Sequence, residues 1–316
     1  MNTQPTGLHH LTAIATDPQA NIDFYAGLLG LRLVKKTVNF DDPSAYHLYY
    51  GDEQGTPGSV ITFFYWPDAP RGRVGSGQVS AITFSAPAES LDFWRNRLEH
   101  HDVPSQRKQR FGEDVLALSD PDGIPVEIVA VADDARAGWA GAGIAGSHAL
   151  RGMHTAELTV RQTGPTEQLL TELMGFRLVR RDGARARFEA GPGGSGRYVD
   201  VIESPSQGQP GTGGTGTIHH IAFRVGTDDE QLAMQTRLSR AGFLVSDVRD
   251  RDYFHSIYYR ERAGILFEIA TDAPGFAIDE APEALGSQLR LPKQFEAARS
   301  RIEALLPPLH GPRQYA

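Results

Sequence analysis

The chain carries one short strand-like phrase twice, as Leu8-His9-His10-Leu11 near its beginning and as Ile218-His219-His220-Ile221 near its end. Each copy opens a longer pattern of one strand, one helix and three further strands, and the same pattern starts again at Val79 and at Met153. Repeated units restrict a fold more strongly than local propensity does. We therefore predict an α+β fold, in which four βαβββ units pair into two barrel-like, concave mixed β-sheets with the helices outside.

The four units also predict how the chain divides into domains. Units one and two precede an Ala/Gly-rich linker, units three and four follow it, and a C-terminal helical extension ends the chain. These parts are expected at residues 1–131 (first two units), 132–150 (linker), 151–275 (last two units) and 276–316 (extension, with an amphipathic helix near 295–306). After its helix, unit four is expected to form strands near 243–248, 256–260 and 264–270.

Composition excludes several classes of function. The formal net charge is -8, and Lys and Arg are scattered along the chain, which argues against nucleic-acid or membrane-surface partners. No stretch approaches the roughly 20 apolar residues that cross a bilayer, and the N-terminus lacks a signal-peptide pattern. The chain has no cysteine, so any metal site must use His, Asp, Glu or Tyr. We expect a cytoplasmic protein, and a homo-oligomer remains open.

Strand alternation selects one histidine from each pair. Because successive side chains face opposite ways, His219 falls in an apolar row with Ile221, whereas His220 falls in the more polar row. We therefore predict that His10 and His220 face the concave side. Glu268 interrupts the apolar run 264–270, and a carboxylate amid apolar surface needs a partner such as a divalent metal.

Each of these residues has a simpler explanation when it is considered alone. A strand histidine is more often hydrogen-bonded or exposed than a metal ligand, and Glu268 could face solvent on an edge strand. The metal hypothesis rests on finding two histidines and one carboxylate together at equivalent ends of repeated units. Such a set is typical of a mononuclear site with open coordination positions.

The inner units serve as a control. Unit three has His154 at the expected place of His220, and unit two has Glu127 at the place of Glu268, but the matching position at the start of unit two is Ser80. A second site would lack one histidine, so we interpret it as vestigial or structural. A complete set arises only by combining units one and four, which predicts that the outer units share one barrel and the inner units the other.

Several phrases together resemble the vicinal oxygen chelate superfamily, which is built from paired βαβββ units. The closer resemblance is to its hydroquinone and chlorohydroquinone ring-cleaving dioxygenases and to their relatives in quinone stress resistance. The matching phrases run over most of the chain: Leu8-His9-His10, Tyr46-His47-Leu48-Tyr49, Gly55-Thr56-Pro57-Gly58, Ile218-His219-His220, Arg251-Asp252-Tyr253-Phe254 and Phe267-Glu268.

The resemblance implies a role for each matching residue. The family's metal ligands fall on His10, His220 and Glu268, and the usual metal is Fe(II), with Mn(II) or another divalent metal as alternatives. Supporting and catalytic positions fall on His9, Thr12, His219, Arg251 and Tyr258. Alternation points His9 and His219 away from the cavity, so they either support the ligands from behind or are packed core histidines.

The implied reaction is cleavage of a small aromatic substrate by O2, which needs no nicotinamide or flavin. The chain departs from the family pattern around Tyr258, where Tyr259 and residues 261–263 replace Pro/Gly turn residues, and this leaves the substrate preference open. Two alternatives remain. One is a glyoxalase-like or catechol extradiol enzyme of the same superfamily, although glyoxalases generally use a second carboxylate ligand that unit one lacks. The other is a metal-free protein that sequesters a small aromatic molecule.

Overall fold

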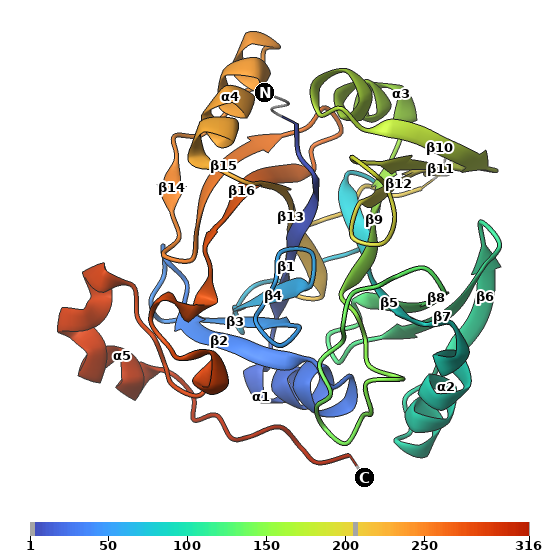
Figure 1. The fold of residues 1–316 in the computed structure, drawn as a ribbon. Helices are drawn as coiled ribbons and strands as arrows, with labels where there is room; N and C mark the ends of the chain where they lie inside the picture. Colours follow the sequence, from blue (N-terminus) through green and yellow to red (C-terminus); the bar gives the residue numbers. More distant parts are fainter. Residues whose placement is uncertain (1–3, 205–207, 316) are drawn as a thin grey trace.

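Two eight-stranded sheets curl side by side in the computed structural model, which describes residues 4–204 and 208–315 (Figure 1). The outer sheet has the strand order β14-β15-β16-β13-β1-β4-β3-β2, and the inner sheet has the order β10-β11-β12-β9-β5-β8-β7-β6. The outer sheet consists of β1 (Gly7–Ala15), β2 (Arg32–Val38), β3 (Tyr46–Gly51), β4 (Val60–Tyr65), β13 (Thr217–Val225), β14 (Arg249–Asp250), β15 (Phe254–Arg260) and β16 (Leu266–Pro274). The inner sheet consists of β5 (Gln78–Pro87), β6 (Gln106–Arg110), β7 (Glu113–Ser119), β8 (Pro125–Val131), β9 (Met153–Val160), β10 (Arg177–Asp182), β11 (Arg185–Glu189) and β12 (Tyr198–Glu203).

Each sheet combines two units in the same way. The first strands of units one and four, β1 and β13, pair antiparallel at the centre of the outer sheet. The first strands of units two and three, β5 and β9, pair likewise in the inner sheet. The predicted fold class is confirmed, as is the prediction that the outer units share one sheet and the inner units the other.

A helical segment follows the first strand of each unit and lies at the periphery of the molecule (Figure 1). These segments are α1 (Pro18–Ile22) with the π-helical turn η1 (Asp23–Leu28), the 3-10 turn η2 (Ala88–Ser90) with α2 (Leu91–His100), α3 (Thr163–Gln168) with the π-helical turn η3 (Leu169–Leu173), and α4 (Asp228–Arg240). Helix α4 begins with a capping box, in which Thr227 accepts the N–H of Glu230 and the Glu230 carboxylate binds the Thr227 N–H. Among the described residues, no helix is long and apolar enough to cross a membrane.

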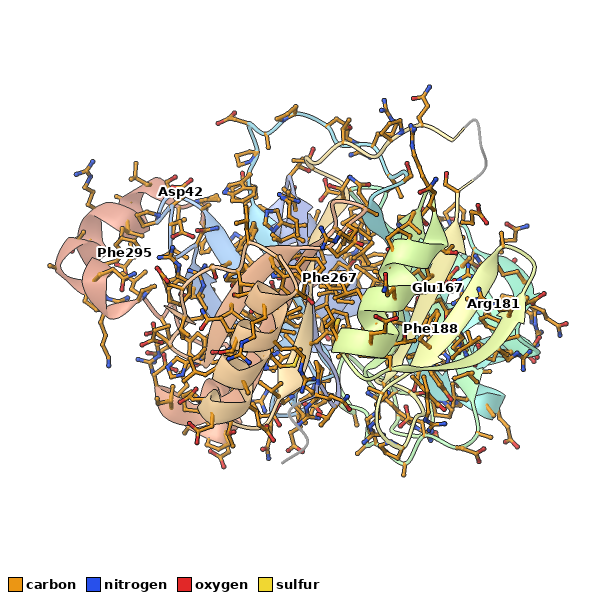
Figure 2. All side chains as sticks on the ribbon, turned by 90° about the horizontal axis from the view of Figure 1, so that it is seen from above. Asp42, Glu167, Arg181, Phe188, Phe267 and Phe295 are labelled. Atoms are coloured by element: carbon orange, nitrogen blue, oxygen red, sulfur yellow. The ribbon has the colours of Figure 1, made fainter. Side chains whose placement is uncertain are left out.

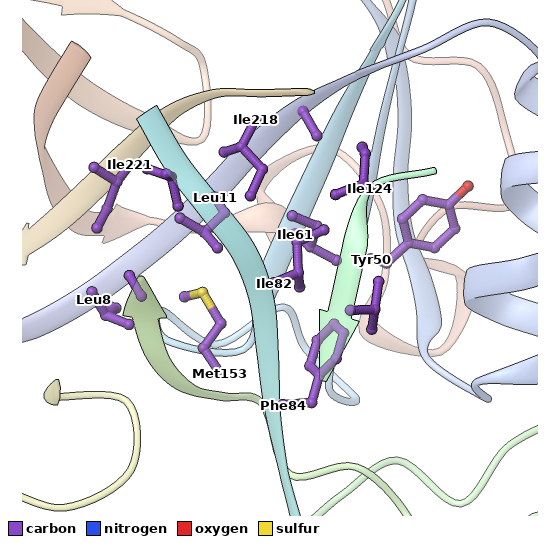
Figure 3. Close-up of a cluster of buried hydrophobic side chains, with 14 of the residues drawn as sticks. Leu8, Leu11, Tyr50, Ile61, Ile82, Phe84, Ile124, Met153, Ile218 and Ile221 are labelled. Carbon is purple, nitrogen blue, oxygen red and sulfur yellow. The ribbon is translucent and has the colours of Figure 1, made fainter. Parts of the chain in front are cut away.

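The central strands of the two sheets pack against each other through apolar side chains. Leu8 and Leu11 of β1 lie beside Ile221 of β13 and face Ile82 of β5 and Met153 of β9 (Figure 3). Each of these five side chains is fully buried. Burial of each such side chain stabilises the folded state by about 1.5–3 kcal/mol, so this core holds the two sheets in a fixed relation.

The inner sheet ends in a charged, exposed edge. All six residues of β10 are exposed, and Arg181 binds Glu167 of α3 through Nη1 and Nη2 at 2.8 and 2.6 Å (Figure 2). Charged edge strands resist pairing with another chain.

The C-terminal extension closes the outer sheet at its β2 edge. It contains the 3-10 turns η4 (Phe276–Ile278), η5 (Pro282–Ala284) and η6 (Lys293–Ala298), followed by α5 (Arg299–Leu305). Lys35 of β2 is fully buried, and its Nζ lies 2.5 Å from carboxylate oxygens of both Asp279 and Glu280. The Arg290 N–H donates to the carbonyl of Lys36 at 2.9 Å, which extends the edge by one bridge. The predicted C-terminal helix is 3-10 up to Ala298 and α-helical from Arg299 to Leu305.

One predicted strand of unit four is wrong. Residues 243–248 form no strand, and only Arg249–Asp250 pair as β14. The reason is local, because the Ser246 hydroxyl accepts the N–H of Tyr258 in place of a backbone carbonyl, at 3.0 Å. Leu244 is 95% exposed, so the alternating apolar pattern there does not mark a buried face.

Candidate active site

Three strands of the outer sheet bring His10, His220 and Glu268 together. The Nε2 atoms of His10 and His220 lie 3.4 and 3.0 Å from Oε2 of Glu268, and 3.4 Å from each other. All three side chains are buried, and the Glu268 carboxylate is completely so. Among the described residues, this is the one group of at least three His, Asp or Glu side chains close enough to hold a metal ion.

A β-bulge at each histidine pair brings both of its rings near this group. Between Leu8 and His10 the β1 strand advances two residues while β13 advances one, so His9 is the extra residue. The same irregularity, with the strands exchanged, makes His219 the extra residue of β13. A bulge interrupts side-chain alternation and redirects side chains near active sites. Consequently, the Nδ1 atom of each first histidine lies within 2.9 Å of the Nδ1 atom of the next.

The hydrogen bonds around His9 assign the protons of His10. The carbonyl oxygen of Thr271 can only accept, so Nε2 of His9, at 3.1 Å, donates to it. Burial, together with the neighbouring His10, lowers the pKa of His9 to about 3, so this ring is neutral and its Nδ1 carries a lone pair. It therefore accepts the Nδ1–H of His10 at 2.9 Å. With its Nδ1–H donated to His9, His10 directs Nε2 at the site, as a metal ligand requires.

His219 makes the corresponding contact nearer the surface, although partial burial still lowers its pKa to about 3. Its Nδ1 lies 2.8 Å from Nδ1 of His220, but its side chain is exposed, whereas that of His9 is 2% exposed. Burial also lowers the pKa of His220, which favours its neutral form.

The remaining predicted site residues line one side of a pocket in front of the three candidate ligands. The guanidinium of Arg251 donates from Nε to the hydroxyl of Tyr258 at 3.3 Å, and the Tyr258 ring lies 5.9 Å from that of His220. Arg251 also faces Asp41, with Nη1 3.7 Å from Oδ2. By contrast, Tyr259 is buried on the opposite face and packs edge-to-face against Phe267. Of the two tyrosines, only Tyr258 lines the pocket.

Several residues of the pocket were not singled out from the sequence. The hydroxyl of Thr62 bridges Thr12, at 2.9 Å, and Nε2 of His47, at 2.8 Å, and Nδ1 of His47 is bound to the hydroxyl of Tyr49 at 2.9 Å. Burial lowers the pKa of His47 well below its usual value, so this ring is neutral. The signal for His47 and Tyr49 was present, since they share one face of a strand and lie in one of the family phrases.

We call this space the substrate pocket. It is small, with a cavity volume of about 40 Å³, opens to solvent, and is lined by His10, Thr12, Asn39, Phe40, Asp41, His47, Tyr49, Phe64, His220, Arg251, Phe254 and Tyr258.

The residues present fit a divalent metal ion. The Ser256 hydroxyl donates to Oε1 of Glu268, while Oε2 is buried and accepts no hydrogen bond from any described residue. This oxygen and two histidine lone pairs converge, and an orphaned buried carboxylate oxygen is costly unless a cation satisfies it. The prediction that such a chain can hold a metal is thus supported by its donor set.

The inner sheet corrects one detail of the sequence interpretation. There the bulges fall on Ser80 and His154, so these residues match His219 and His9, not the ligand positions. The ligand positions themselves are Ala81 and Thr155. The predicted match between the units was wrong by one residue, because the position of a bulge depends on strand pairing and cannot be read from the sequence.

Glu127 does occupy the position equivalent to that of Glu268, but its partners are basic side chains. It pairs with Lys108 and Arg110, and Arg110 also binds Glu157. Nearby, Glu113 accepts hydrogen bonds from His154 at 3.0 Å and Arg187 at 2.5 Å.

These partners decide the ionisation of Glu113. Burial acts to raise its pKa, but the His154 and Arg187 contacts outweigh this and lower the pKa to about 2. Ion pairs therefore fill the concave side of the inner sheet.

Comparison with known proteins places the chain in a family. The Glyoxalase/Bleomycin resistance protein/Dioxygenase superfamily profile matches residues 7–128 and 152–269, and the chain belongs to this superfamily. It is 45% identical to MhqO of Bacillus subtilis strain 168, named as a ring-cleaving dioxygenase, over 97% of this chain and 98% of the relative. It is 35% identical to the chlorohydroquinone/hydroquinone 1,2-dioxygenase of Sphingobium indicum, over 94% of each chain.

The crystal structure of a Bacillus subtilis protein that is named as a dioxygenase has the same fold as this chain over nearly its whole length. Its TM-score is 0.94 at 44% identity, covering 97% of this chain and 98% of that one. The predicted resemblance to ring-cleaving dioxygenases is therefore confirmed, and with it the class of enzyme.

Proposed function

We propose that the chain is a non-haem Fe(II)-dependent dioxygenase that cleaves hydroquinone-type aromatics in the cytoplasm, inserting both atoms of O2 beside a hydroxyl-bearing ring carbon. The observation that carries this proposal is the convergence of the Nε2 atoms of two imidazoles and one buried carboxylate at the base of a small pocket. Two histidines and one carboxylate with open positions are typical of non-haem Fe(II) oxygenases. The relatives named above support the substrate class.

His10, His220 and Glu268 would hold the iron. When bound, this ion would supply the Lewis acidity and the redox chemistry that ring cleavage by dioxygen needs. The three side chains come from β1, β13 and β16, so the site is built on adjacent strands of one rigid sheet. Such a base holds ligands more accurately than loops do.

Arg251 and Tyr258 would bind the substrate oxygen. The Tyr258 hydroxyl accepts the Nε–H of Arg251, so its own hydrogen is free to be donated to a ligand in the pocket. Burial raises the pKa of Tyr258, which keeps this hydroxyl protonated. The fixed positive charge of Arg251 favours a phenol that has lost its proton.

Aromatic side chains would exclude water around the ring. Phe64 and Phe254 line the pocket beside the candidate ligands, and Phe40 covers Arg251, with its ring centre 5.5 Å from the guanidinium carbon. Both ring nitrogens of His47 are already hydrogen-bonded, so the Thr12 hydroxyl would receive a second substituent of the ring. A para-dihydroxybenzene has two oxygens, one for Arg251 and Tyr258 and one for Thr12.

Oxygen uptake tests this proposal. The chain is loaded anaerobically with one equivalent of Fe(II) and offered hydroquinone, methylhydroquinone, chlorohydroquinone or catechol with ¹⁸O2. We expect uptake with at least one hydroquinone and two labelled atoms in the product. Uptake confined to catechol would favour an extradiol enzyme, and no uptake at full iron occupancy would sink the dioxygenase proposal.

Glu268→Gln should abolish the activity. Its matched control is Glu127→Gln, which alters the equivalent acid of the inner sheet and should leave uptake unchanged.

A further inference from the structure

A second pocket reaches the candidate metal site from behind. Its inner end is formed by His9 and Phe254, and its walls include Pro57, Phe276, Ala277 and Leu285. It has a cavity volume of about 270 Å³ and opens to solvent. We call it the rear pocket. Phe254 also lines the substrate pocket, so the two spaces share this side chain.

We propose that the rear pocket is the route by which dioxygen reaches the candidate metal site, with Phe254 as its gate. This inference rests on the proposed function, because it assigns a path to one of the two substrates.

The barrier between the pockets is one side chain thick. The Phe254 ring centre lies 4.9 Å from that of His9 and 5.1 Å from that of His10, a candidate ligand. Phe254 is 4% exposed, and a phenyl ring makes no hydrogen bond that would hold it in place. Rotation of this ring costs packing only, so it can open a passage for a diatomic molecule without breaking a polar contact.

The lining of the rear pocket suits dioxygen better than a phenol. Its lining is mixed, with Phe254, Phe276 and Leu285 beside the polar Gln54 and Thr56. Dioxygen needs no polar partner, and small uncharged molecules bind against apolar side chains, as xenon does. No Lys or Arg lines the rear pocket among the described residues, and its Asp272 is paired with Arg224 at 2.5 Å. The lining therefore offers a phenolate no cation, whereas Arg251 attracts it in the substrate pocket.

With two separate routes, dioxygen can reach the candidate metal site while the aromatic substrate is bound. The substrate pocket is small, and its lining includes both candidate histidine ligands. An aromatic ring bound there would fill the space in front of the metal and block the same route for a second molecule. The rear pocket approaches from the side of His9 and stays open.

Plugging the mouth of the rear pocket tests the route. Ala277 and Thr56 are exposed residues of its lining, so Ala277→Trp and Thr56→Trp should fill the mouth without disturbing the core. Ile278→Trp is the matched control, because Ile278 neighbours Ala277 and is 60% exposed but does not line this pocket. Steady-state rates are measured against oxygen concentration with saturating hydroquinone, and hydroquinone binding is measured anaerobically.

We expect each plugging variant to raise the KM for O2 at least fivefold and to change the Kd of hydroquinone less than twofold, with Ile278→Trp like the wild type. An unchanged KM for O2 in both plugging variants, or an equal rise in the control, would overturn the route.

Xenon provides a readout that does not depend on activity. Metal-free crystals under xenon pressure should show xenon in the rear pocket of the wild type and none there in Ala277→Trp. Absence of xenon from the wild-type pocket would overturn the proposal. If wild-type protein consumes no oxygen, the proposed function fails, and the xenon result still decides whether the pocket accepts a small apolar gas.

Discussion

Replacing His9 by Phe keeps a planar ring in a buried position but removes the acceptor for the Nδ1–H of His10. His9 is 2% exposed, so water cannot take over the lost 2.9 Å hydrogen bond. Removing such support from a ligating histidine typically weakens metal binding about 10- to 100-fold. This loss corresponds to about 1.4–2.7 kcal/mol of binding free energy.

His219→Phe is the matched comparison within the same molecule. It removes the equivalent 2.8 Å contact to His220, but His219 is exposed, so a water molecule can accept the His220 Nδ1–H instead. We expect a loss of about threefold or less in affinity. His9→Asn should fall between the two, because its amide oxygen can accept near the former Nδ1 position.

Anaerobic titration of Fe(II) against a competing chelator measures these affinities. The predicted order of affinity is wild type, His219→Phe, His9→Asn and His9→Phe, from tightest to weakest. Equal losses for the two Phe variants would refute the argument from burial, and an unchanged affinity in His9→Phe would refute the role of His9 in supporting His10.

Three further predictions concern other parts of the molecule. Lys35→Met removes the nearer cation of the 1% exposed Glu280 carboxylate, leaves Arg290 at 4.0 Å, and should cost about 3–5 kcal/mol. For 316 residues at about 2.1 cal/mol/K each, the Tm falls by about 5–8 °C, whereas Lys36→Met, at a half-buried neighbour, should shift the Tm by less than 1 °C. The pKa of Glu113 is about 2 in the folded chain against an ordinary 4.5, so its ionised form stabilises the fold above pH 4.5 and this effect is lost as the pH falls towards 2. The difference in free energy of unfolding between wild type and Glu113→Gln, measured by urea titration, should therefore shrink from pH 7 to pH 3. A constant difference would contradict the assignment. Tyr258→Phe removes a donor to a charged substrate oxygen and should lower kcat/KM by about 10- to 150-fold with iron affinity unchanged; a parallel loss of iron would show that Tyr258 supports the metal site itself.

Much of the fold can be predicted from the sequence because one structural pattern occurs four times along the chain. Four copies of one pattern give each unit its strand order, and the distribution of His10, His220 and Glu268 among the units predicts which units share a sheet. Strand alternation then distinguishes the two candidate ligands from the histidines that precede them. These inferences need only local periodicity and a count of which units hold which residues.

Features that depend on partner strands could not be predicted in this way. Whether a strand contains a bulge depends on its pairing register, so the positions of His9 and His154 relative to the ligand positions could not be derived from alternation. The buried Lys35 reads as an ordinary surface cation of an edge strand until the C-terminal extension covers it. His47 reaches the pocket because β3 pairs with β4, which carries its hydrogen-bond partner Thr62.

The most direct test of the metal site is a crystal structure of the chain loaded anaerobically with Fe(II), with diffraction measured on both sides of the iron absorption edge. We predict one strong anomalous peak, in contact with Nε2 of His10, Nε2 of His220 and Oε2 of Glu268. An empty outer-sheet site at full iron occupancy, or a peak bound elsewhere in the molecule, would contradict the account.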